Sequence, residues 1–147
     1  MDELKYTFMT DILAKMLFVR HPVLLQKLVA LLLDIPFVSI EYFVITNPEM
    51  PPESLGDKYC RLDINMVVDG RRINLEFQVE NEGNYSERAL FHWAREYSSS
   101  LPSGGNYREL PKVIVISIVD FPLFEGSNFH SEFRVLEVSR HTPLTDK

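Results

Sequence analysis

The sequence predicts an α/β fold in which a central mixed sheet is flanked by helices. Apolar spacing gives the order helix, strand, strand, strand, helix, strand, with one more strand near the end. A short hairpin turn joins two alternating strands, which makes that pair antiparallel. The strand–helix–strand unit of residues 71–119 should cross over right-handedly and place its last strand parallel to its partner. We expect a single domain over residues 1–147.

Two helices are expected first, over residues 7–20 and 22–33, because leucine and other apolar residues recur there at helical spacing. Pro22 separates them, since the residue before a proline avoids the helical region and proline itself suits the first helical position. Residues 37–46 are rich in β-branched and aromatic residues and are predicted to form a strand. The proline-rich segment 47–57 is predicted to be a loop or a lid.

A β-hairpin is predicted for residues 59–80. Polarity alternates on both sides of Asp69-Gly70, and this pair is a strong signal for a type I′ turn, which needs positive φ at both central positions. A register slip of one residue would mix the apolar and polar faces, so the pattern also predicts the register. The apolar pairs are Val68–Arg71, Met66–Ile73, Ile64–Leu75 and Leu62–Phe77, and the polar pairs are Asn65–Asn74, Asp63–Glu76 and Arg61–Gln78.

The predicted hairpin sets the carboxylates of Asp63 and Glu76 directly opposite each other. Opposed residues have Cβ atoms about 5 Å apart, where like charges are destabilising. Two interpretations stay open. The pair belongs to an ordinary solvated face of a half-buried sheet, or it holds a divalent cation, because hard cations such as Mg²⁺ bind carboxylate oxygens.

The second half of the chain is predicted to contain a helix from Asn84 to about Ser100, with Asn84 and Glu87 as a capping pair. Residues 113–119 are continuously apolar, as in a strand buried on both faces, and residues 129–138 alternate like an edge strand. The expected core side of the helix carries Ala89, Leu90, Trp93, Ala94, Tyr97 and Leu101, and the opposite stripe carries Arg88, His92, Arg95 and Ser99.

Composition excludes several classes of protein. With 46% hydrophobic and 24% charged residues, the chain has the make-up of a globular domain with a core. The net charge of −6 counts against a protein that coats nucleic acid by bulk charge. No apolar run is long enough to span a bilayer, and the acidic start is unlike a signal peptide. The one cysteine, Cys60, is expected on the core side of a strand, as a buried small hydrophobic residue. This composition fits a protein of the reducing cytoplasm. The chain stops without an obvious ending at Lys147, which suggests the N-terminal part of a longer protein.

Four segments together resemble the PD-(D/E)XK nuclease family transposases, also called recombination-promoting nucleases. They are Leu62-Asp63-Ile64, the strand Ile73 to Val79, the helix Arg88 to Ser99 and the strand Val113 to Phe121. The resemblance covers residues 7 to 147 and is strongest between residues 58 and 124. It implies a restriction-endonuclease-like αβββαβ core and a metal-dependent DNA endonuclease that serves recombination or mobile elements.

The same resemblance implies roles for individual residues. Asp63 and Glu76 would bind Mg²⁺, with Mn²⁺ also suitable, and carboxylate-held metal would activate water and clamp the phosphate. Gln78 falls where the superfamily has its catalytic lysine, and a glutamine can act neither as a cation nor as a general acid or base. Glu80 shares the strand face and Asp11 matches a family position on the first helix, so both are further candidate site acids.

DNA is the expected partner, without a membrane, and a homodimer stays open because two cuts by one site usually need two copies. The helix residues Arg88, His92 and Arg95 are candidates for contacts with DNA phosphates, against the alternative of a solvated helix face. Two rival readings remain. One is a catalytically inactive nuclease-like fold that binds DNA or protein, which Gln78 and the acidic charge favour. The other is a small regulatory domain that binds no metal.

Overall fold

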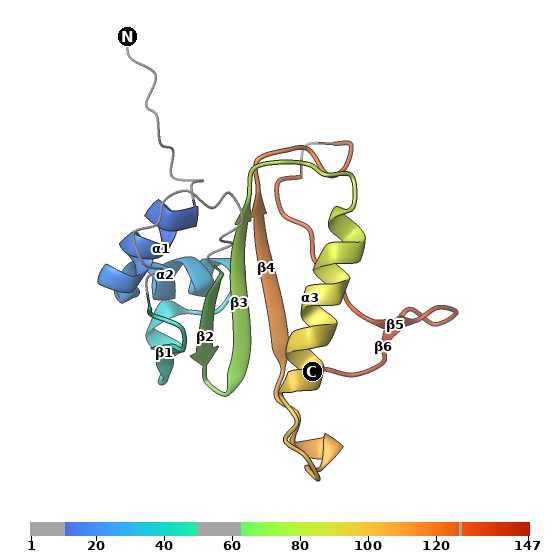
Figure 1. Cartoon of the computed structure of the whole chain (residues 1–147). Coiled ribbons are helices and arrows are strands. Elements are labelled where there is room, and N and C mark those ends of the chain that lie inside the picture. The colour runs from blue at the N-terminus through green and yellow to red at the C-terminus, as the bar shows by residue number, and fades with distance from the viewer. Residues whose placement is uncertain (1–10, 50–62, 127) are drawn as a thin grey trace.

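The computed structural model of the chain describes residues 11–49, 63–126 and 128–147, with only the backbone described for residues 11 and 12. Figure 1 shows a four-stranded sheet with helices on both of its sides. The elements in chain order are α1 (Asp11–Arg20), α2 (Pro22–Leu32), the 3-10 helix η1 (Phe37–Ser39), β1 (Phe43–Ile45), β2 (Ile64–Val68), β3 (Arg71–Gln78), α3 (Tyr85–Ser99), the 3-10 helix η2 (Tyr107–Glu109), β4 (Val113–Val119), β5 (Leu136–Glu137) and β6 (Thr142–Pro143).

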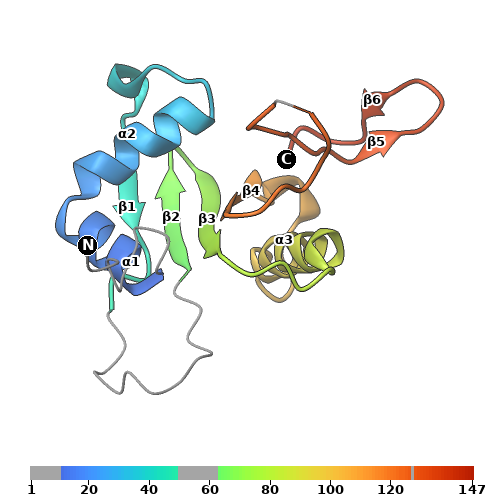
Figure 2. The same cartoon turned by 90° about the horizontal axis from the view of Figure 1, so that it is seen from above.

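The main sheet is mixed, as the sequence predicts. Its strand order is β1-β2-β3-β4, with antiparallel pairs β1–β2 and β2–β3 and the parallel pair β3–β4. Helix α3 lies within the connection from β3 to β4, which is what lets the two strands run in the same direction. Seen from above in Figure 2, α1 and α2 lie beside β1 and β2, while α3 lies beside β4. The predicted α/β class with a central mixed sheet is confirmed.

The hairpin of β2 and β3 has the predicted turn and register. Asp69 and Gly70 have φ angles of 47° and 77°, so both adopt the left-handed conformation that a type I′ turn requires. The predicted pairs Leu62–Phe77 and Arg61–Gln78, like Cys60, involve residues outside the described ranges. The observed pairs include Val68–Arg71, Met66–Ile73, Ile64–Leu75 and Asn65–Asn74.

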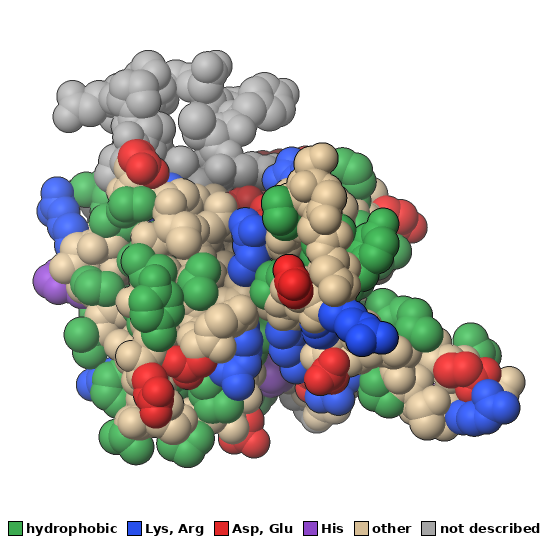
Figure 3. All heavy atoms as spheres, turned by 90° about the horizontal axis from the view of Figure 1, so that it is seen from below, with side chains coloured by type: hydrophobic (Ala, Val, Ile, Leu, Met, Phe, Trp, Pro, Cys, Tyr) green, Lys and Arg blue, Asp and Glu red, His purple; other side chains and the backbone are tan. Residues whose placement is uncertain are grey.

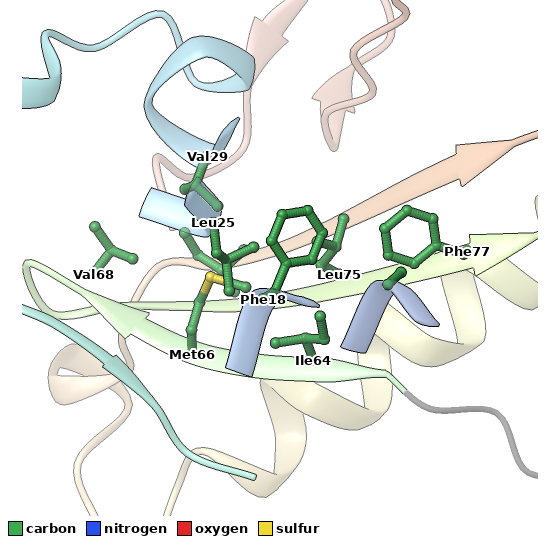
Figure 4. Packing of buried hydrophobic residues seen from close by; sticks show 10 residues of the cluster. Phe18, Leu25, Val29, Ile64, Met66, Val68, Leu75 and Phe77 are labelled. Atoms are coloured by element: carbon green, nitrogen blue, oxygen red, sulfur yellow. The ribbon is translucent and has the colours of Figure 1, made fainter. Parts of the chain in front are cut away.

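One face of this hairpin forms the hydrophobic core with α1 and α2. Phe18 of α1 stacks on Phe77 of β3 with ring centroids 6.4 Å apart. Leu25 and Val29 of α2 are fully buried, and so is Leu75 of β3. Figure 4 shows these side chains between the helices and the sheet, with Ile64, Met66 and Val68 of β2. Burying a side chain of this size contributes about 1.5–3 kcal/mol, so this face anchors the sheet.

The strand predicted over residues 37–46 is wrong in its first half. Residues Phe37–Ser39 form η1, because the backbone N–H and the hydroxyl of Ser39 both donate to the carbonyl of Pro36, at 2.9 and 2.7 Å. Only Phe43–Ile45 pair with β2. Proline presets φ for a turn, and this local hydrogen bonding outweighs the β propensity of the residues that follow.

The edge strand predicted over residues 129–138 is also wrong. Within it, only Leu136–Glu137 form a strand, β5, which pairs with β6 in a separate two-stranded sheet. Phe129, Phe133 and Val138 are exposed, so the apolar positions of the alternating pattern have no core face to cover. Figure 1 shows this small hairpin projecting away from the main sheet.

Strand β4 has the predicted residues and cover on both faces. Ile114, Ile116 and Ile118 pack against the core, and α3 lies against the other face. Most of the strand is only half-buried, because β4 is the last strand of the sheet. Within the described residues, no helix has both the length and the apolar character that crossing a membrane requires.

Candidate active site

The face of β3 opposite the core is polar but is hidden from solvent. Asn74, Glu76 and Gln78 alternate with core residues along the strand, and each is at most 6% exposed. The sequence left open whether this face is simply solvated. Because α3 covers it, that interpretation does not hold, and its polar groups need partners inside the protein.

Three side chains from three different elements meet on this face. Asp63 lies just before β2, Glu76 lies on β3 and His92 lies on α3. One ligand atom from each, two carboxylate oxygens and an imidazole nitrogen, lie within 4.8 Å of one another. Glu76 is buried, whereas Asp63 and His92 are half-buried, so the group is reachable from one side. The predicted approach of the two acids is thus present, with a histidine added.

Neutral donors orient the two carboxylates. The hydroxyl of Ser117 on β4 donates to Glu76 Oε1 at 2.6 Å, across the parallel pair β3–β4. The amide of Asn74 donates to Asp63 Oδ2 at 3.4 Å and to Asn65 Oδ1 at 2.7 Å. These donors are neutral, so they position the carboxylates without adding a positive charge of their own.

Asn47 joins the segment after β1 to this end of the sheet. Its side-chain amide donates to the carbonyl of Asp63 at 2.8 Å, and its carbonyl oxygen accepts from the backbone N–H of Asn65 at 2.7 Å. The side chain therefore acts like a short piece of strand and holds the backbone of Asp63 in place, although Asp63 itself precedes β2.

A buried lysine lies on the α1 side of the same region. Lys15 is 4% exposed. Burial lowers the pKa of Lys15, and the negative charges of Glu49 and Asp63 partly oppose that effect. A positive charge therefore acts on Asp63 from the helical layer.

Both polar atoms of the Gln78 side chain have partners within the protein. Its carbonyl oxygen accepts from Nη2 of Arg88, and its amide group donates to the carbonyl of Glu80 at 2.9 Å. Arg88 also pairs with Glu82, with 3.5 Å between Nη1 and Oε2. The Arg88 side chain is 13% exposed, and its Nε atom is buried with no hydrogen-bond partner among the described residues.

The remaining predicted site residues lie outside this group. The side chain of Glu80 is exposed, and its backbone carbonyl accepts from Gln78. Arg95 is exposed on α3. The side chain of Asp11 lies outside the described residues.

Helix α3 is rotated relative to the prediction, although Ala89, Trp93 and Tyr97 of the expected core side are half-buried. Leu90 is 61% exposed and Ala94 is exposed, whereas Arg88 and His92 point toward the sheet. The sheet face beneath α3 is polar, so polar helix residues face it. Trp93 lies on the expected side and donates its indole N–H to the carbonyl of Val113 at 3.1 Å.

The start of α3 also differs from the prediction in one respect. Asn84 occupies the N-cap position as expected, but its side chain makes no capping hydrogen bond. The carbonyl of Asn84 accepts the ordinary first hydrogen bond of the helix, from the N–H of Arg88 at 3.1 Å.

A pocket of about 200 Å³ lies on the same polar face. Asn65 and Asn74, which support Asp63, form part of its wall. Arg72 and Glu96, which form an ion pair at 3.7 Å, line it as well. The polar face is therefore hollowed along β2 and β3, next to the asparagines.

Comparison with known proteins decides the family. A sequence model described as PD-(D/E)XK nuclease family transposase matches residues 8–147. The chain belongs to this family. No match was found among curated proteins, and none among solved structures. Membership confirms the resemblance and indicates a nuclease associated with mobile elements, for which DNA is the suggested substrate.

PD-(D/E)XK nucleases usually use divalent metals, and the residues of this site fit such an ion. Carboxylate and imidazole groups are ordinary ligands of divalent cations. Two of the three donors, Asp63 just before β2 and Glu76 on β3, are the acids that the family resemblance singles out. The sequence alone did not predict His92 as part of this group, because no sequence pattern showed that α3 packs over the polar face of the hairpin.

Proposed function

We propose that the protein is a divalent-metal-dependent DNA endonuclease, with Asp63 and Glu76 as metal ligands and Mg²⁺ or Mn²⁺ as the metal. The observation that supports this most is the convergence of Asp63, Glu76 and His92 on a covered face within a nuclease fold. A metal bound there would lower the pKa of a water nucleophile and stabilise charge on the phosphate.

In this proposal the protein side chains divide the remaining work. Ser117 and Asn74 hold the carboxylates in position. Arg88 supplies the positive charge that Gln78 lacks, since Gln78 itself is occupied in holding the guanidinium group. The unpartnered Nε–H of Arg88 is a donor that a phosphate oxygen can satisfy. Arg95, on the exposed part of α3, contacts the DNA backbone farther from the cut.

The net charge of the protein favours DNA binding through a few local contacts over attraction by overall charge. The chain carries a net charge of −6. Figure 3 shows Lys and Arg side chains near the middle of one face with acidic side chains among them. DNA binding should therefore depend on a few arginines at specific positions. The decrease of DNA affinity with salt should be steeper when more of these arginines contact phosphates.

The experiment that tests this proposal is nicking of supercoiled plasmid in Mg²⁺ or Mn²⁺. The wild type is compared with Asp63→Ala, Glu76→Ala and the exposed-acid control Glu109→Ala. We expect metal-dependent nicking that both site variants lose by about 100-fold or more, because several kcal/mol of transition-state stabilisation disappear. The control should cut like the wild type.

Two other outcomes would contradict the proposal. A folded wild type that binds DNA and metal but never nicks favours the second candidate, an inactive nuclease-like binding module, which Gln78 and the acidic charge support. A wild type whose melting temperature does not respond to Mg²⁺ or Mn²⁺ favours a domain without a metal site.

A further inference from the structure

His92 lies where a third metal ligand would lie. The sequence placed it on a helix stripe expected to face solvent or DNA phosphates, yet α3 turns it toward the sheet. One of its ring nitrogens lies within 4.8 Å of a carboxylate oxygen of Asp63 and of Glu76. Atoms that share an ion at about 2.1 Å are at most about 4.2 Å apart, so a small adjustment brings all three to one ion.

We propose that His92 is a protein ligand of the metal, and that the site therefore prefers Mn²⁺ to Mg²⁺. This inference rests on the proposed function and adds a ligand to the two acids. Mg²⁺ favours oxygen ligands and retained waters. Imidazole suits transition metals, whereas carboxylates suit Mg²⁺ and Mn²⁺ alike, so a site with both kinds of donor favours Mn²⁺.

The surroundings of His92 support a ligand role over a contact with DNA. Its ring is half-buried between α3 and the sheet, and it is held by a helix that is anchored through Trp93 and through Arg88. A phosphate-binding side chain at this depth would have to share its space with two carboxylates, which repel a phosphate. A metal cation removes that conflict because it attracts all three groups.

The test is pulsed electron paramagnetic resonance of Mn²⁺ bound to the whole protein. A directly bound imidazole couples its ¹⁴N nucleus to the Mn²⁺ spin and modulates the echo. We expect this ¹⁴N modulation in the wild type, its loss in His92→Gln, and its persistence in the matched control His130→Gln, whose histidine is exposed in the C-terminal segment. Circular dichroism shows whether each variant is folded.

Calorimetric titration with each metal alone gives a second readout. We expect His92→Gln to weaken Mn²⁺ binding by about tenfold or more, as loss of a supporting group at a metal site already does. Mg²⁺ binding should change less, so the preference for Mn²⁺ shrinks.

The outcomes separate this inference from the proposed function. Wild-type Mn²⁺ binding that depends on Asp63 and Glu76 but shows no ¹⁴N modulation overturns the role of His92 and leaves the two-acid site standing. The absence of Mn²⁺ binding overturns both. Because the wild-type spectrum alone decides the first point, a misfolded variant cannot hide the answer.

Discussion

The family resemblance sets Gln78 where the superfamily has its catalytic lysine, and a neutral amide can act neither as a cation nor as a general acid or base. Both of its polar atoms are used, one toward Arg88 and one toward the carbonyl of Glu80. The residue is therefore better understood as a support for Arg88. Its neutral side chain brings a permanently charged guanidinium group to the site.

Changing Arg88 should separate catalysis from binding. We expect Arg88→Gln to lower kcat by about 100-fold with little change in KM, because removing one group that stabilises transition-state charge costs about that much. Arg88→Lys should recover part of kcat, since it restores the charge but not the fork geometry. Steady-state nicking assays at several DNA concentrations measure both constants.

Arg95 and Arg108 provide the comparison. Arg95→Gln should raise KM while kcat stays close to the wild-type value, and the exposed Arg108→Gln should change neither. Equal effects of Arg88→Gln and Arg95→Gln on KM alone would show that Arg88 only binds the DNA backbone.

At the scale of single residues, the sequence predicted the approach of Asp63 and Glu76 but not the contact of Ser117 with Glu76. Asp63 and Glu76 could be found because a period-two pattern around a defined turn fixes the register of a hairpin. Ser117 is a single hydroxyl within an apolar strand, and its contact with Glu76 depends on the register of a parallel pair. The register of β3 against β4 depends on how the long connection between the two strands packs. No local sequence pattern specifies that register.

Helix α3 shows why the orientation of an element is harder to predict than its existence. Its bounds, Tyr85–Ser99, match the expected helix closely. The rotation of α3 about its own axis was predicted by turning its apolar stripe toward the sheet. That rule is valid only when the opposing sheet surface is apolar. Here the opposing surface carries the candidate site, so Leu90 faces solvent and His92 faces the sheet.

The hairpin turn is fastened to the segment before β1 by one carboxylate. Asp69 Oδ1 accepts from the backbone N–H groups of Glu41, at 3.1 Å, and Tyr42, at 2.8 Å. Asp69→Ala should lower the free energy of unfolding by about 1–3 kcal/mol, since it strands two donors and puts alanine at positive φ. Urea denaturation followed by circular dichroism measures this change.

A second substitution at the same position tells the two causes apart. Asp69→Gly removes the carboxylate but accepts positive φ freely, so it should be less harmful than Asp69→Ala. If both variants unfold within about 0.5 kcal/mol of the wild type, the carboxylate does not stabilise the junction.

For the molecule as a whole, Lys15 makes stability depend on pH. The side chain lies in the interface between the helical layer and the site end of the sheet, and its pKa is lowered because burial disfavours the charged form. Below that lowered pKa the folded state bears the full cost of burying the charge. As pH rises toward 10.5 the unfolded state binds more protons than the folded state, so stability rises.

Lys15→Met should therefore stabilise the protein by roughly 1 kcal/mol at neutral pH, because burial of a charge is replaced by burial of an apolar chain. This gain should shrink as pH approaches 10.5. Chemical denaturation of both proteins across that pH range measures it, with the exposed Lys112→Met as control. A less stable Lys15→Met would mean that attraction to Glu49 and Asp63 outweighs the cost of burial.

The parallel pairing of β3 with β4 has a consequence for how the chain folds. The hairpin of β2 and β3 closes through a two-residue turn, whereas β4 joins only after residues 79–112 have folded back. Contacts between distant parts of a chain form more slowly than local ones. We therefore expect the two acids to approach each other early, as neighbouring like charges, and Ser117 and His92 to arrive late. That late docking step adds the hydrogen bond from Ser117 to Glu76 and completes the proposed set of metal ligands.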